Sequence, residues 1–168
     1  NAYNKLSDTF LHTTTYNAFG EESITALEAI NIFSEKDFHL KVTNLSKLLS
    51  EKLQFLKNKH PDKIESIKGT GILNGIVFKS YLSSLGNIIE KLPLSFINNK
   101  SFFLKKLTAS AISSELYEKY NILASINDSK NSNHLCVAPA LIINENDVNY
   151  FFESLEKTLN DGVNTKSL

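Results

Sequence analysis

The stretch 64-IESIKGTGILNGIVF-78 decides the fold class of this chain. Short runs of β-branched and other apolar residues lie on both sides of Gly69 and Gly71. Such runs, interrupted by glycines, are typical of two strands joined by a turn or a bulge. We therefore expect a pair of antiparallel strands in this stretch.

Gly69-Thr70-Gly71 also carries the glycines of a phosphate-binding loop. A P-loop needs a Lys-Ser/Thr pair and the N-terminus of a helix directly behind its glycines. Here an apolar strand follows the glycines instead. The nucleotide-binding interpretation is therefore rejected.

Helical spacing of apolar residues marks four other parts of the chain. The first is 21–33, which begins with two glutamates, and the second carries a leucine stripe and ends near His60. Residues 102–121 predict a third helix. Asn144, with Asp147 three residues later, is typical of an N-cap and predicts the start of a fourth helix.

Two further strands are expected at 122–126 and 134–138, joined as a hairpin by the polar loop 127–133. Residues 79–101 contain several breakers and are expected to form a partly helical excursion. The predicted fold class is α+β: a small antiparallel sheet of about four strands with helices packed on one face, preceded by a long linking helix.

The composition narrows the classes of partner. The 18 basic residues, all lysines, balance 18 acidic residues, so neither nucleic acid nor an anionic membrane is favoured as a partner. The four histidines lack metal-ligand spacing, and no metal is expected. The single cysteine and the lack of a long apolar run predict a cytoplasmic protein that does not enter the membrane.

The stretch 10-FLHTTTYNAFGEES-23 places three consecutive threonines, Thr13, Thr14 and Thr15, just before the first predicted helix. Hydroxyls and backbone N–H groups at such a position bind anions without a fixed cation. The alternative is a β-prone connector whose hydroxyls only satisfy the backbone around the helix start. Both interpretations fit these residues taken alone.

The order of elements and three local patterns resemble the C-terminal part of class III aminotransferases, which are pyridoxal-phosphate enzymes of fold type I. The first pattern is the segment His12–Phe19, which matches a threonine-aromatic motif of that family. The resemblance implies that Thr15 reaches across a homodimer interface to the phosphate of pyridoxal 5'-phosphate, with Thr14 beside it.

The second pattern is residues 68–78, whose three glycines fall in register with a strand pair of the family. The third is residues 133–143, where the arginine that pairs with a substrate carboxylate in many members falls on Cys136. A neutral thiol cannot replace that charged pair. Either the substrate lacks a carboxylate there or another residue supplies the contact. Cys136 itself is expected to be a buried strand thiol rather than a nucleophile.

The resemblance implies an enzyme that transfers an amino group between a small amine or amino acid and a keto or aldehyde acceptor. The Schiff-base lysine is expected upstream of Asn1, so no catalytic residue is assigned in this chain, which alone is expected to be inactive. Two alternatives stay open. One is another reaction on the same fold, that of an aminomutase or a decarboxylase, and the other is a non-catalytic dimerisation or interaction domain.

The predicted organisation has four parts. Residues 1–20 form an entry segment with the threonine motif, and 21–60 form helices that link a large domain to a small one. Residues 61–160 form the small domain, and 161–168 form a tail.

Overall fold

A computed structural model describes residues 20–80, 100–129 and 132–162 of the chain. The chain divides into two compact units, Asn1–Lys41 and Val42–Leu168. Each unit is described by itself.

In the first unit, helix α1 (Gly20–Ser34) confirms the helix predicted at 21–33. Its two glutamates lie in the first turn, where they complement the positive end of the helix dipole. None of its residues is buried, and Ile24, Leu27 and Ile30 are exposed. The apolar stripe that identified this helix in the sequence therefore stays open to solvent in the described structure.

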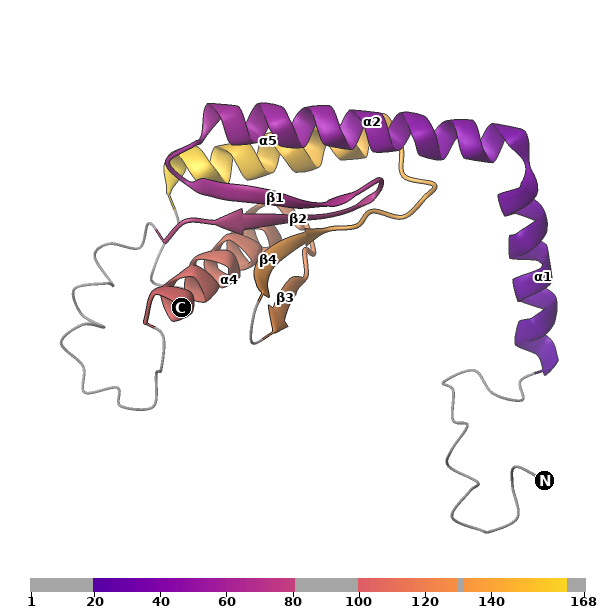
Figure 1. Cartoon of the computed structure of the whole chain (residues 1–168), viewed down its shortest axis with the longest axis horizontal. Helices are drawn as coiled ribbons and strands as arrows, with labels where there is room; N and C mark the ends of the chain where they lie inside the picture. Colours follow the sequence, from indigo (N-terminus) through magenta and orange to yellow (C-terminus); the bar gives the residue numbers. More distant parts are fainter. Residues whose placement is uncertain (1–19, 81–99, 130–131, 163–168) are drawn as a thin grey trace, which may run out of the picture. The chain divides into compact units, whose positions relative to one another are not determined.

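The second unit is built on an antiparallel sheet of four strands in the order β1-β2-β4-β3, shown in Figure 1. The strands are β1 (Ile64–Thr70), β2 (Leu73–Phe78), β3 (Ile126–Ser129) and β4 (Ser132–Val137). All three pairings are antiparallel. The sheet confirms the predicted α+β class.

The β1–β2 hairpin turns at the glycines that predicted it. Thr70 pairs with Leu73, and Gly71 has a φ of 63° at the first position of the two-residue turn between them. Two-residue hairpin turns need such a positive φ, which glycine adopts without strain. Gly69 also has a positive φ, of 99°, and a Cβ there would lie 2.9 Å from the Cα of Asn74.

The structure corrects the limits of the second hairpin. The predicted strand 122–126 and loop 127–133 are wrong, because β3 begins at Ile126 and β4 begins at Ser132. Asparagine, aspartate and serine are poor strand residues, but β3 is an edge strand, where packing demands on side chains are weak. Residues 122–125 instead form an extended link from α4, and one backbone bond joins Cys136 N to Ser125 O at 2.8 Å.

Helices α2 (Lys36–Lys59), α4 (Lys100–Tyr120) and α5 (Glu145–Asp161) confirm the other three predicted helices. They pack on one face of the sheet and enclose a single core. The helices contribute Leu45, Leu49, Leu53, Leu56, Ala109, Ile112, Leu116, Val148, Phe152, Leu155 and Leu159 to it, and the strands contribute Ile64, Ile76, Phe78, Leu135 and Val137.

Polar contacts fix the ends of these helices. The Asn144 side chain accepts a hydrogen bond from Asp147 N at 2.9 Å, which confirms the predicted N-cap of α5. Lys59 at the end of α2 pairs with Glu156 on α5. Asn121 ends α4 in the left-handed conformation, with a φ of 55°.

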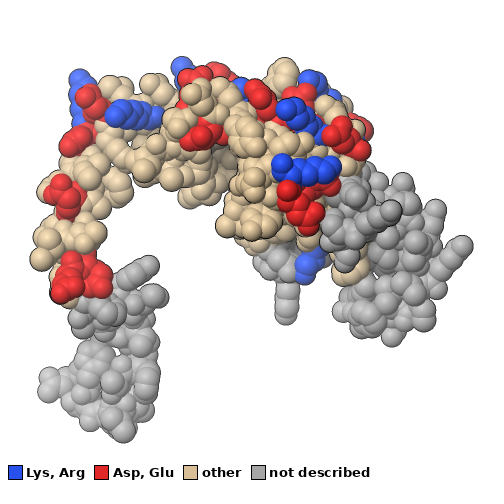
Figure 2. Space-filling view, turned by 180° about the vertical axis from the view of Figure 1, so that it is seen from behind, with Lys and Arg blue, Asp and Glu red and all other residues tan. Residues whose placement is uncertain are grey.

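Acidic and basic side chains lie interspersed on the face of the molecule shown in Figure 2. Within the described ranges, no helix combines the length and the apolar character that crossing a membrane requires.

Replacing Gly69 by alanine should destabilise the second unit more than replacing Gly71. Both positions have a positive φ, which costs alanine about 1–2 kcal/mol, but only a Cβ at Gly69 meets backbone atoms of the opposite strand. We expect Gly69→Ala to lower the free energy of unfolding by at least about 2 kcal/mol and Gly71→Ala by about 1 kcal/mol. Urea denaturation measures both, and equal losses would contradict the close approach seen at Gly69.

Acid should destabilise the second unit through His60, which is 6% exposed and follows the end of α2. Burial, and next the charge of Lys63, lower the pKa of His60 below its ordinary value of 6.5. As the pH falls below about 6.5, the unfolded chain therefore binds the proton first, and stability is lost until the folded-state pKa is passed. His60→Gln should flatten the decline in unfolding free energy between about pH 7.5 and about pH 5. An unchanged slope would exclude His60 as its source.

Candidate functional site

None of the described helices packs on the second face of the sheet, which we call the open face. The residues of this face follow from strand alternation. Ile76 and Leu135 pair across β2 and β4 and point into the core. Their neighbours Gly75 and Cys136, which also pair, therefore face the other way. On the other edge of β2, Gly75 pairs with Lys68 of β1. Lys68, Gly75 and Cys136 thus form one row across three strands on the open face.

A hollow of about 340 Å³ lies over this row, and we call it the open-face hollow. Its walls combine one cation, one imidazole, one amide, one thiol and small apolar surfaces. The lining residues are Lys68, Gly69, Leu73, Asn74, Gly75, His134, Cys136 and Ala138.

His134 owes its position to the glycine on the neighbouring strand. A Cβ at Gly75 would lie 2.9 Å from Cγ of His134, closer than such atoms approach. The imidazole therefore occupies space that a side chain at position 75 would fill. Within the same hollow, the Asn74 amide nitrogen donates to Gly71 O at 2.9 Å, which holds the amide against the turn.

The electrostatics of the hollow are set by Lys68. Burial lowers the pKa of His134 below 6.5, and the positive charge of Lys68 lowers it further. At neutral pH the imidazole is therefore uncharged, with one nitrogen that donates and one that accepts hydrogen bonds. Lys68 is exposed, and none of the ion pairs between described residues includes it.

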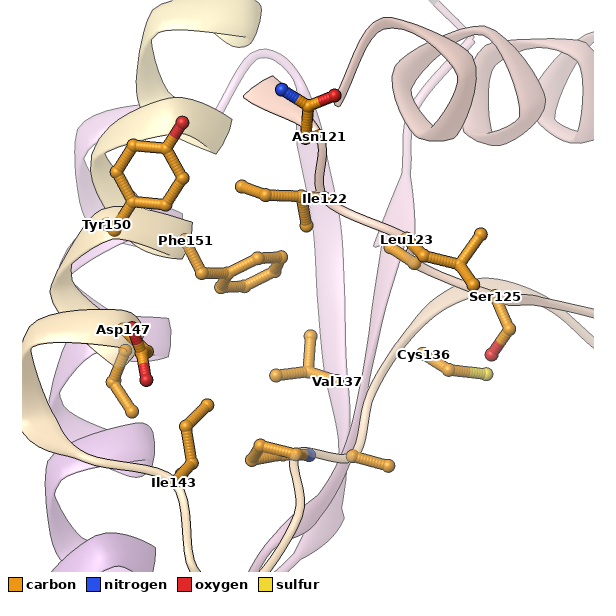
Figure 3. A pocket seen from close by; sticks show the side chains of 14 residues that line it. Asn121, Ile122, Leu123, Ser125, Cys136, Val137, Ile143, Asp147, Tyr150 and Phe151 are labelled. Atoms are coloured by element: carbon orange, nitrogen blue, oxygen red, sulfur yellow. The ribbon is translucent and has the colours of Figure 1, made fainter. Parts of the chain in front are cut away.

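A second hollow, of about 350 Å³, lies between the start of α5 and the extended link 122–125. Figure 3 shows Ile122, Val137 and Phe151 turned toward one another in its apolar part. Two of its polar side chains are engaged in local structure. Tyr150 Oη donates to the carbonyl of Tyr120 at 3.1 Å, and the Asp147 carboxylate accepts from the Asn144 amide at 2.6 Å. This hollow therefore offers mainly hydrophobic contact.

Cys136 borders both hollows, and in Figure 3 its side chain lies beside Ser125, apart from the apolar cluster. Its side chain is half-buried rather than buried, which corrects the expectation of a buried thiol. The strand turns this side chain to the open face instead of the core.

Thr14 and Thr15 lie outside the described residues, so their predicted role at a cofactor phosphate stays a prediction. The part of the chain that the structure describes contains no group of three or more metal-binding side chains.

Lys68 and His134 line the open-face hollow although no sequence pattern predicted either residue as part of a site. For Lys68, the length of the hairpin turn could have predicted its position on the sheet. A two-residue turn at Gly71-Ile72 dictates that Lys68 pairs with Gly75. The pairing of β2 with β4, which adds Cys136 and His134, joins segments far apart in the chain and has no such local signal.

No known family model matches the chain. Two curated relatives do, both named mitochondrial acetylornithine aminotransferase. The protein from Debaryomyces hansenii is 34% identical over 80 residues, which cover 48% of this chain and 17% of the relative. The protein from Candida glabrata is 25% identical over 108 residues, or 64% of this chain and 25% of the relative. The matched part thus spans a quarter or less of either relative.

Solved structures of aminotransferases share the fold. A Bacillus anthracis aminotransferase superposes with a TM-score of 0.63 at 18% identity, over 95% of this chain and 32% of that one. A Plasmodium falciparum ornithine delta-aminotransferase gives a TM-score of 0.57 at 18% identity, over 89% of this chain and 31% of that one. Sequence and fold together relate the chain to the class III aminotransferases and match it to a C-terminal portion of such an enzyme.

Proposed function

We propose that the full-length protein transfers an amino group between a small amine or amino acid and a keto or aldehyde acceptor, and that this chain is its C-terminal portion. The observation that carries the proposal is the 34% identity over 80 residues to an acetylornithine aminotransferase. The shared fold over 95% of the chain supports it.

Pyridoxal 5'-phosphate would supply the electron sink for this chemistry when bound. In the proposal, the Schiff-base lysine lies upstream of Asn1, and this chain contributes to the cofactor through Thr15 and Thr14. Their hydroxyls would donate to the phosphate of the partner subunit's cofactor, which makes the working unit a homodimer. The chain has no arginine, so hydroxyls and backbone N–H groups are the fitting donors there.

Among the described residues, those that line the open-face hollow would contact the substrate rather than the cofactor. The sheet holds the open-face hollow on a rigid support, because its other face is fixed to three helices. A site on such a support keeps its side chains in place when a ligand arrives. The compartment stays a prediction: the cytoplasm was expected, whereas both relatives have mitochondrial names.

One feature favours a second candidate, an aminomutase or decarboxylase on the same fold. Cys136 stands where the resemblance expects an arginine, and a thiol does not fix a carboxylate in the same way. Product analysis separates the candidates. Transfer yields a new amine and a new keto product, isomerisation yields one rearranged amine, and decarboxylation releases carbon dioxide.

The full-length protein should bind pyridoxal phosphate and transfer amino groups. We expect an absorbance band of the bound cofactor that borohydride abolishes, together with conversion of a keto acceptor to its amine. Mass spectrometry of the acceptor, with a nitrogen-labelled donor, measures the transfer. Protein that neither binds the cofactor nor moves the label would refute the proposal.

Thr15→Ala in the full-length protein should weaken retention of the cofactor. Loss of a hydrogen bond to a charged acceptor costs about 1–3 kcal/mol, which is roughly a 5- to 150-fold rise in the dissociation constant. Thr15→Ser keeps the hydroxyl and serves as the matched control. The measurement is the decay of cofactor absorbance during dialysis, and equal decay in all three proteins would exclude the role given to Thr15.

A further inference from the structure

We propose that the open-face hollow binds the carboxylate of a small organic acid, and that Lys68 supplies the positive charge that holds it. The assignment of this acid as the substrate rests on the amino-group transfer proposed above. The binding itself depends only on the residues of the hollow.

The row on the open face allows Lys68 to reach the centre of the hollow. Lys68 pairs with Gly75, and Gly75 pairs with Cys136. Neighbouring strands are about 4.8 Å apart, so the Cα atoms of Lys68 and Cys136 are separated by about 10 Å. The four-carbon stem of a lysine extends about 6 Å from its Cα, far enough to reach the strand of Gly75 but not Cys136. The His134 imidazole lies over Gly75, so the ammonium enters the hollow beside that ring.

The charges around the hollow favour an anion. Among the described residues, its lining contains one lysine and no carboxylate. Several other described lysines are engaged elsewhere: Lys59, Lys105 and Lys119 pair with glutamates, and Lys63 and Lys79 donate to backbone carbonyls. The positive charge of Lys68 is therefore not balanced by any other lining residue of the hollow that the structure describes.

The neighbours of Lys68 suit a carboxylate better than a phosphate. Burial, and next the charge of Lys68, lower the pKa of His134, so the imidazole adds no second charge beside Lys68. A phosphate needs several donors, such as successive backbone N–H groups or an arginine fork, and the hollow offers a single cation. One ammonium matches the single negative charge of a carboxylate.

The apolar part of the lining defines the rest of the ligand. Leu73, which is 65% exposed, and Ala138 border the hollow beside the polar row. A volume of about 340 Å³ lies at the lower end of the range for small-molecule sites. The ligand class is therefore an acid with a short carbon chain, such as an amino acid or a keto acid.

Binding is tested on the full-length protein with butyrate and butyramide, which have nearly the same shape but differ in charge. The reporter is the His134 imidazole signal in nuclear magnetic resonance spectra, assigned with His134→Gln. We expect butyrate to shift this signal more than butyramide does, and added salt to weaken the effect. Lys68→Gln should weaken butyrate binding about three- to tenfold.

Two matched variants control this test. Lys68→Arg keeps the charge and should keep most of the affinity, whereas Lys157→Gln removes an exposed lysine on α5 that lines neither hollow and should change nothing. Butyrate binding that is undetectable, or equally tight after Lys68→Gln, would overturn the proposal. Tighter binding of inorganic phosphate than of butyrate would overturn the assignment to carboxylates.

The link to the substrate is tested by kinetics with an amino acid and the amine that lacks only its carboxylate. Lys68→Gln should raise KM for the amino acid about three- to tenfold and leave KM for the amine unchanged. An equal rise for both donors would overturn the role of Lys68 in substrate binding. If the protein transfers no amino group at all, the proposed function fails, while the butyrate titration still decides whether the hollow binds carboxylates.

Discussion

Burial of a single face of the sheet is the constraint on which the rest of this structure depends. The leucine stripe of α2 and the apolar sides of α4 and α5 form one core against Ile76 and Leu135. Because strand side chains alternate, fixing these residues inward fixes their neighbours on the other face. A shift of one residue in β4 would expose Leu135 and bury His134 and Cys136. The hydrophobic core thus determines which polar groups the open face presents.

That open face presents the polar side chains that line the open-face hollow. Gly75 leaves space for the His134 imidazole, whose pKa is lowered by burial and next by the charge of Lys68, and Lys68 provides a positive charge at the hollow. In an amino-group-transferring enzyme, such a face would meet the substrate, and the threonines before α1 would meet the cofactor. Because the sequence contains no arginine, anions bound by this chain would be held by hydroxyls, backbone N–H groups or lysine instead of a guanidinium.

The sequence was sufficient for elements with strong local signals. Leucine spacing in α2, the Asn144 cap of α5 and the glycines of the first hairpin are local features, and the structure confirms each. The second hairpin failed because an edge strand tolerates residues that are otherwise typical of loops. The pairing of Lys68 with Gly75 in the open-face row was also predictable from the turn at Gly71. The place of Cys136 in that row depends on the pairing of β2 with β4, which global packing decides.

The most direct test of one-sided burial is the reactivity of the single cysteine of the chain under native conditions. Cys136 and Val137 are neighbours on β4, but Val137 is 5% exposed and belongs to the core. A thiol reagent should therefore modify Cys136 rapidly without unfolding. In the Cys136→Ser, Val137→Cys variant, the thiol should react only as fast as the protein unfolds. Equal protection at both positions would show that the sheet is covered on both faces and would contradict the account.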